Sequence, residues 1–240
     1  MKERAIETVA LRSFGLIVLL GLTLQAAGQD AKTQYPSMAP LEQYLMEQNA
    51  EIALARTAAP ESLSKDAEIM ALRRQGYETA VKGKNGFVCL VWRSWTAGTD
   101  DPDFWNPKLR SPVCFNAAAA RSQIPMTHKK TEVILASRSK EQMADTVKTA
   151  FDRKELPTPE PGAMCYMMSK QQYLNDRGKQ WHPHLMFFLP LTDTTAWGAN
   201  SLGSPVIGIK DDLDRLTLFL ITVSKWSDGT AAPPMPTDEH

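Results

Sequence analysis

The sequence predicts an α+β fold, with a mixed or largely antiparallel sheet of about five to seven strands and N-terminal helices packed on it. Helical periodicity is concentrated near the start of the domain. Most of the remaining chain consists of short apolar runs separated by turn-forming residues. Helices and strands therefore do not alternate regularly, as they would in a βαβ fold.

Three segments have the apolar spacing of helices. The first begins at Leu41 and stops before Pro60. The second is expected over residues 64–81, because Ser64 suits an N-cap and acidic residues follow it in the first turn. The third is expected over residues 139–153 and ends before a proline-rich connector, which cannot be helical.

The strands are predicted from short apolar runs. Four runs are apolar on both alternating faces, as in strands that are covered on both sides. These four runs are residues 87–92, 163–168, 185–189 and 216–223. Shorter strands are expected over residues 112–115, 133–136 and 206–209.

Residues 1–28 have the composition of a cleaved export signal. A basic start is followed by an uncharged apolar run over residues 14–24 and then by the small residues Ala26, Ala27 and Gly28. The apolar run is shorter than the roughly 20 residues that a membrane-spanning helix needs. An uncleaved N-terminal anchor is the alternative. We expect a periplasmic or secreted protein that has no membrane contact after cleavage.

The processed chain is expected to form one domain. We predict a flexible leader over residues 29–40, a single globular α+β domain over residues 41–230 and a disordered tail over residues 231–240. The sequence has 27 basic and 27 acidic residues. This balance argues against nucleic acid as the main partner. The expected partner is an unknown small molecule or protein.

Two of the three cysteines are expected to pair. If the chain folds back between the strands at 87–92 and 112–115, antiparallel pairing places Cys89 opposite Cys114. Opposed residues are close enough for a disulfide, which would stabilise the fold by about 3 kcal/mol in the chain-entropy model. The alternative is that both remain reduced in the core. Cys165 is expected to be buried and reduced.

Two histidines, His182 and His184, stand at the start of the apolar run 185–189. On an extended strand their side chains project from one face, about 7 Å apart, and could share a metal ion. A third ligand at a diagnostic spacing is missing, so we predict no metal and no cofactor. The favoured interpretation places both histidines in solvent at the entrance of a buried strand. If a ligand pocket exists there, its expected neighbours are Tyr166, Asn200 and Ser201.

Two other patterns suggest a site. Trp92 and Arg93, with further tryptophans around the expected hairpin, could line a site for a sugar or an aromatic ligand. Core and rim packing is the favoured alternative. Ser201 lies in a sequence that resembles a nucleophile elbow, but a strand is expected after it, where an elbow requires a helix.

Three stretches, GFVCLVWRSW, SPVCFNAAAARSQIP and PHLMFFLP, resemble blocks of uncharacterised exported bacterial proteins. None of them is a motif with established chemistry. The resemblance implies an exported bacterial domain and no particular activity.

These observations favour an exported, soluble, non-enzymatic domain that binds a small molecule or a partner protein. The alternative is a secreted hydrolase or metal-dependent enzyme that uses His184. The sequence contains neither a complete nucleophile motif nor a complete metal motif, and this favours the binding domain.

Overall fold

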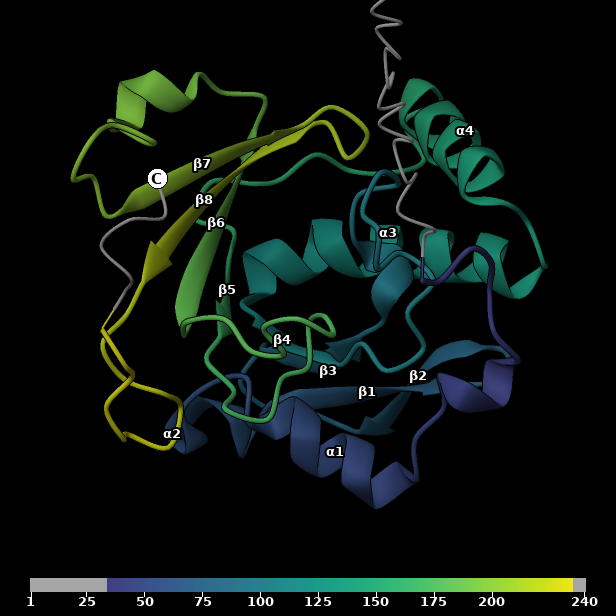
Figure 1. Ribbon diagram of the computed structural model, residues 1–240, viewed down its shortest axis with the longest axis horizontal. Helices are drawn as coiled ribbons and strands as arrows, with labels where there is room; N and C mark the ends of the chain where they lie inside the picture. Colours follow the sequence, from purple (N-terminus) through teal and green to yellow (C-terminus); the bar gives the residue numbers. More distant parts are fainter. Residues whose placement is uncertain (1–33, 235–240) are drawn as a thin grey trace, which may run out of the picture. The chain divides into compact units, whose positions relative to one another are not determined.

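A computed structural model of the chain describes residues 34–234 (Figure 1). The helices are η1 (Leu41–Gln43), α1 (Gln48–Arg56), α2 (Glu61–Ser64), η2 (Ser94–Thr96), α3 (Ala117–Leu135), α4 (Lys140–Asp152) and η3 (Thr194–Trp197). The strands are β1 (Glu68–Arg73), β2 (Gly76–Val81), β3 (Val88–Trp92), β4 (Ser111–Phe115), β5 (Met164–Met167), β6 (His184–Pro190), β7 (Val206–Asp211) and β8 (Leu216–Thr222). None of the helices in this range has the length and hydropathy that a membrane crossing requires.

The eight strands form one sheet in the order β2-β1-β3-β4-β5-β6-β8-β7. Strands β1 and β3 pair in parallel, and the other neighbours pair antiparallel. The predicted α+β class with a mixed sheet is therefore confirmed, with one strand more than the expected range. Figure 1 shows α1 on one side of β1 and β3 and α3 on the other side.

The two faces of the sheet bury different cores, because side chains alternate along each strand. On β3, Cys89 and Val91 belong to a smaller core that also contains residues of α1. Leu90 belongs to a larger core that also contains residues of α3 and α4, together with Phe115 of β4. We call these the α1 face and the α3 face of the sheet.

Strands β6, β8 and β7 form the end of the sheet that is remote from α1 (Figure 1). Met186 and Phe188 of β6 are buried in the larger core, on the α3 face. On the opposite face of β8, the indole of Trp197 in η3 stacks on Phe219, with ring centroids 4.3 Å apart. Short loops and η3, rather than a long helix, therefore cover that face of this end.

The prediction of a helix over residues 64–81 is wrong. Strands β1 and β2 occupy most of this segment and pair as a hairpin around Arg74 and Gln75. Gly76 has a φ of 127°, a conformation that favours glycine and that ends any helix. Strand β1 is buried along most of its length between its neighbours and α1, so long-range pairing overrides the local helix propensity.

The prediction of a strand over residues 133–136 is also wrong, because this segment is the C-terminal end of α3. The helix starts at Asn116, whose side chain accepts a hydrogen bond from the backbone N–H of Ala119 at 2.9 Å. It contains Pro125 in its interior. Its buried side includes polar residues, which interrupt the apolar stripe that normally reveals a helix. These buried polar residues are Ser122, Gln123, Thr127, Lys130 and Thr131.

The remaining predicted strands are present within about two residues of their expected ends. The helix predicted over 139–153 is α4, which Ser139 begins with a capping box. The helix expected from Leu41 is divided into η1 and α1.

The expected ends of the domain fall partly outside the described residues, as does the whole export signal. The described part of the leader, residues 34–40, packs against the larger core through Tyr35, Met38 and Ala39. In the tail, Ala231 forms a bridge with Lys225.

The predicted cysteine pairing is confirmed. In the antiparallel pair of β3 and β4, Cys89 lies opposite Cys114. Their Cα atoms are 3.9 Å apart and their sulfur atoms are at bonding distance. Cys165 is free and buried, as expected.

Candidate functional site

His184 is buried, so the expectation that both histidines face solvent is wrong for this residue. Its side chain is 3% exposed and belongs to the α3 face of β6. Its Nδ1 lies 2.8 Å from the carbonyl oxygen of His182, and its ring packs against Trp181 with centroids 4.7 Å apart. Burial lowers the pKa of His184 to about 4, so the ring is neutral at pH 7. His182 is half-buried, at the strand entrance.

The residues expected around His184 do not gather into one pocket. Tyr166 lies opposite Leu185, so its side chain belongs to the α1 face, whereas His184 belongs to the α3 face. Asn200 and Ser201 lie in the loop between η3 and β7, where the Asn200 amide hydrogen-bonds the backbone of β7. Within residues 34–234, no three His, Cys, Asp or Glu side chains are arranged to hold a metal ion.

Arg93 is buried and contributes to the fold. Its guanidinium donates to Glu51 Oε1 and to the carbonyl oxygen of Tyr44, both at 2.7 Å. Glu51 Oε1 also accepts a hydrogen bond from the backbone N–H of Leu72. Both charged side chains are 0% exposed. The pair joins α1 to the sheet, and the charge of Arg93 is not accessible to a ligand.

Trp92 is the predicted site residue that borders a cavity. Its indole lies on the α3 face, and its Nε1 donates to Thr127 Oγ1 at 3.1 Å. The cavity has a volume of about 100 Å³ and lies between α3 and the strands β6 and β8. We call it the α3–β8 cleft. Its walls include Gln123, Thr127, Lys130, Phe188, Leu216 and Leu218.

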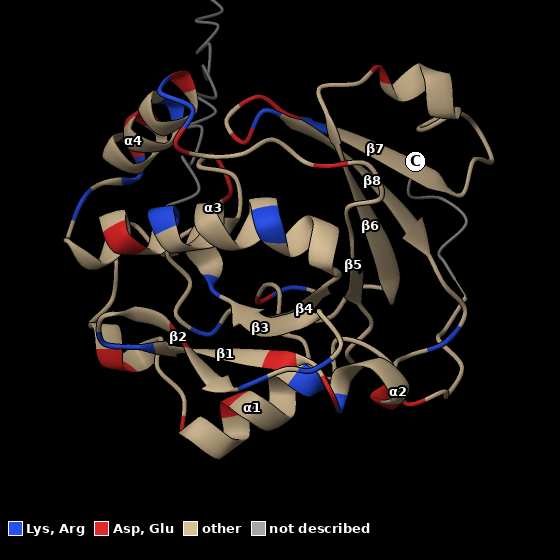
Figure 2. Cartoon of the chain, turned by 180° about the vertical axis from the view of Figure 1, so that it is seen from behind, with Lys and Arg blue, Asp and Glu red and all other residues tan. Residues whose placement is uncertain are grey.

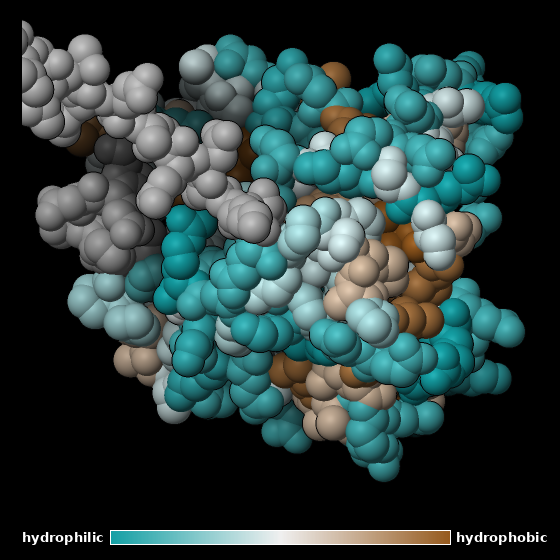
Figure 3. Space-filling model, turned by 45° about the vertical axis from the view of Figure 1, so that its right-hand side comes forward, coloured by the Kyte–Doolittle hydropathy of each residue, from teal (hydrophilic) through white to brown (hydrophobic). Residues whose placement is uncertain are grey.

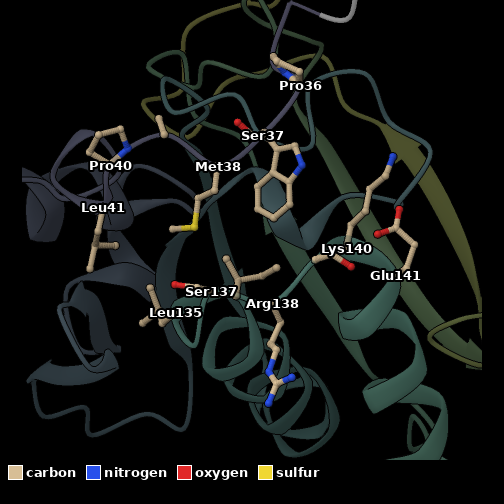
Figure 4. Close-up of a pocket in the computed structure, with 14 residues that line it drawn as sticks. Pro36, Ser37, Met38, Pro40, Leu41, Leu135, Ser137, Arg138, Lys140 and Glu141 are labelled. Carbon is tan, nitrogen blue, oxygen red and sulfur yellow. The ribbon is translucent and has the colours of Figure 1, made fainter.

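A larger cavity, of about 720 Å³, lies where the chain passes over the connection between α3 and α4 (Figure 4). We call residues 36–41 the strap and this cavity the strap pocket. The buried side chains of Trp105 and Ile134 form part of its lining. Figure 4 shows Met38 on the strap pointing toward Leu135 on the opposite wall. The centre of the pocket is therefore apolar.

Hydrogen bonds hold the strap in place. Just before it, the hydroxyl of Tyr35 donates to the carboxylate of Asp176, which also accepts from the hydroxyl of Tyr173. The bond from Tyr173 and then that from Tyr35 lower the pKa of Asp176 to about 2. Within the strap, the backbone N–H of Ala39 donates to the Tyr44 hydroxyl oxygen at 3.3 Å. The strap is thus attached to the domain on both sides of Met38.

The wall opposite the strap is polar at its rim. After Leu135 the chain turns at Ser137, which has a φ of 58°, and Ser139 then caps α4. Lys140 donates to a backbone carbonyl of the loop after η2, and Figure 4 shows the Arg138 guanidinium pointing away from Met38. Figure 3 shows that the surface on this side of the molecule is mostly hydrophilic, with apolar residues in limited areas.

Sequence reasoning missed the strap pocket, because Met38 lies in a segment that was expected to be flexible. The available signal was the presence of Met38 and Ala39 at the end of the leader, directly before the helix expected from Leu41. Trp105 is one of the tryptophans around the expected hairpin, and the sequence does not indicate which part of the molecule it faces.

Comparison with models of known protein families, with curated proteins and with solved structures finds no match to this chain. The geometry of the two cavities is therefore the basis for a functional proposal.

Proposed function

We propose that this chain is an exported, non-enzymatic domain that binds a small amphiphilic molecule in the strap pocket. The observation that carries this proposal is the cavity of about 720 Å³ with Trp105 in its lining. Ligand pockets typically have volumes of about 300–1,000 Å³ and are lined mainly by apolar and aromatic side chains. Export is supported by the N-terminal apolar run and by the Cys89–Cys114 pair, because disulfides persist in oxidising compartments.

The lining favours a ligand with an apolar body and a polar end. Burial of an apolar surface against Met38, Trp105 and Leu135 stabilises a complex by about 25 cal/mol per Å² removed from water. The hydroxyl groups of Ser137 and Ser139 lie at the rim, where they can hydrogen-bond the polar end of the ligand.

The alternative enzyme, which uses His184, has less support from the geometry. A general base must come within hydrogen-bond reach of the proton that it removes. His184 is buried against Trp181, and its Nδ1 faces the carbonyl oxygen of His182. A substrate would have to displace core side chains to reach this ring.

Binding of 8-anilino-1-naphthalenesulfonate, an amphiphilic dye that fluoresces in apolar pockets, tests the proposal. We expect saturable binding to the purified protein and at least ten-fold weaker binding to Met38→Glu and to Leu135→Glu. Each substitution places a charge on an apolar wall of the pocket. The matched control is Leu202→Glu, which adds the same charge at a leucine that is 100% exposed elsewhere.

Circular dichroism and thermal unfolding must show that all three variants remain folded. Equal dye affinity in the folded Met38→Glu, Leu135→Glu and Leu202→Glu proteins would show that the dye binds elsewhere, and the strap pocket would lose its proposed role.

A further inference from the structure

We propose that the α3–β8 cleft is a second binding site, which takes a small organic ammonium ion with an apolar tail. This cleft is separate from the strap pocket: one wall is the middle of α3 and the other is formed by β6, β8 and the turn between β7 and β8. The proposal therefore goes beyond the function proposed above.

The cleft has an inner and an outer chamber. The inner chamber, of about 100 Å³, lies between α3 and the strands, and the outer chamber, of about 420 Å³, lies toward the loop after η2. The two chambers share the lining residues Thr96, Lys130, Asp211 and Leu218. A ligand can therefore extend from the outer chamber into the inner one.

The inner chamber has a buried hydrogen-bond acceptor that lacks a donor. Lys130 Nζ donates to Asp214 Oδ2 at 2.7 Å, whereas Asp214 Oδ1 is buried without a hydrogen-bond partner among the described residues. Gln123 is 5% exposed, and its amide nitrogen lies 3.3 Å from Ser122 Oγ. Its carbonyl oxygen can accept a hydrogen bond from a ligand in the chamber. A buried acceptor without a donor costs about 1–3 kcal/mol, and a ligand that donates hydrogen bonds removes this cost.

Negative charge exceeds positive charge around the cleft. Lys130 is paired with Asp214, and Lys210 is paired with Asp212 at 2.8 Å. Asp211 adds a further carboxylate to the lining of both chambers. Figure 2 shows charged residues gathered at the turn between β7 and β8, while β6 and β8 carry none. Burial raises the pKa of Asp214, and the nearby Asp211 adds to the rise.

The rest of the inner chamber is apolar. Met186, Phe188, Leu216 and Leu218 line it from the strands, and Trp92 closes it on the side of β3. An alkyl or aryl tail buries its surface against these side chains. A positive head group beside Asp211 and Asp214 offsets the excess negative charge there. An anionic ligand would meet these carboxylates, and a neutral ligand would leave the excess charge uncompensated.

Isothermal titration calorimetry of the purified protein with three ligands of equal tail length tests this inference. The ligands are n-hexylammonium, hexan-1-ol and hexanoate. We expect n-hexylammonium to bind at least ten-fold more tightly than the other two. Its affinity should fall as the salt concentration rises, because salt screens the attraction.

Variants locate the site. We expect Asp214→Asn to weaken n-hexylammonium binding at least ten-fold. Because this change leaves Lys130 without its partner, Gln123→Leu provides a second test that keeps the ion pair, with an expected loss of at least three-fold. Asp228→Asn is the matched control, because it makes the same charge change at an exposed side chain that pairs with Lys170, outside the lining of both chambers. It should change the affinity less than two-fold.

Three results would overturn the inference. The first is equal or tighter binding of hexanoate or hexan-1-ol, and the second is unchanged affinity in both folded Asp214→Asn and Gln123→Leu. The third is loss of n-hexylammonium binding in Met38→Glu, which would place the ligand in the strap pocket. Failure of dye binding in the strap pocket has no bearing on these results, so the two proposals fail separately.

Discussion

Within residues 34–234, two ion pairs between largely buried side chains have similar geometry and different surroundings. Glu51–Arg93 on the α1 face and Lys130–Asp214 on the α3 face both have a nitrogen–oxygen distance of 2.7 Å. Arg93 and Glu51 are enclosed by protein and hydrogen-bond backbone groups of β1 and of the segment after η1. Lys130 and Asp214 border a cavity. The first pair fixes the position of α1, and the second has room beside it for a ligand.

Each pair also leaves one carboxylate oxygen without a hydrogen bond. Beside Glu51 Oε2, the guanidinium of Arg73 lies 3.7 Å away and compensates its charge. Beside Asp214 Oδ1, the nearby charged group is another carboxylate, that of Asp211. Burial of an ion pair therefore does not by itself reveal its role, because the neighbouring groups decide whether a further ligand is accommodated.

Arg93→Met tests the structural pair and should have the largest effect. It leaves Glu51 buried without its partner, which typically costs 3–5 kcal/mol. Urea unfolding followed by tryptophan fluorescence measures the loss. The matched control is Arg121→Met, which breaks an exposed pair with Glu160 and should cost less than about 1 kcal/mol. Similar costs for the two variants would contradict a structural role for Arg93.

The stability of the α3 face should depend on pH through His184. Its folded-state pKa of about 4 lies below the ordinary value of 6.5. As the pH falls, the unfolded chain therefore binds the proton first. The contribution of the neutral, buried His184 ring to the free energy of unfolding is complete above pH 6.5 and is lost as the pH approaches 4. The loss should be about 3 kcal/mol. Unfolding curves of the protein and of His184→Phe between pH 4 and 7 measure it.

The control for this prediction is His182→Gln, at a half-buried position. It should change the stability by less than about 0.5 kcal/mol and should keep the pH dependence. If His184→Phe shows the same pH dependence as the unchanged protein, the assignment of this titration to His184 is wrong.

Lys130→Met should have a smaller effect than Arg93→Met, about 1–3 kcal/mol. The Asp214 side chain is 13% exposed and can be hydrated once Lys130 is replaced, whereas Glu51 is 0% exposed. Burial raises the pKa of Asp214 above 3.8, and removal of Lys130 raises it further. A raised carboxyl pKa means that, as the pH falls, the folded state binds the proton before the unfolded chain does. The free energy of unfolding therefore decreases as the pH rises above 3.8. Urea unfolding at pH 5 and pH 8 should show the larger loss at pH 8. A loss equal to that of Arg93→Met at both values would contradict the proposed difference.

Much of the fold could be predicted from local patterns. The run around Cys89 is apolar on both faces and indicates a covered strand, and the expected fold-back of the chain pairs it with the shorter strand around Cys114. Residues 68–81 could not be assigned in this way. Their helix-forming residues are held in strands by pairing with β3 and packing on α1, which are contacts distant in sequence.

The candidate sites were less predictable than the fold. The polar buried residues of α3, such as Gln123 and Lys130, have partners or neighbours on strands far along the chain. His184 resembles a surface histidine in sequence, because polar residues precede it. Its burial follows from Trp181, which folds against its ring. The side of the sheet that each residue faces could be predicted only after the register was known.

We propose that ligand binding belongs to the α3 face and that the α1 face serves the fold. Amide ¹⁵N–¹H spectra of the purified protein, titrated with 8-anilino-1-naphthalenesulfonate, test this claim most directly. We expect shifts at Met38, Leu135 and their neighbours, with the signals of Glu51 and Arg93 unchanged. Shifts confined to α1, or to the exposed apolar residues Trp197 and Leu202, would contradict it.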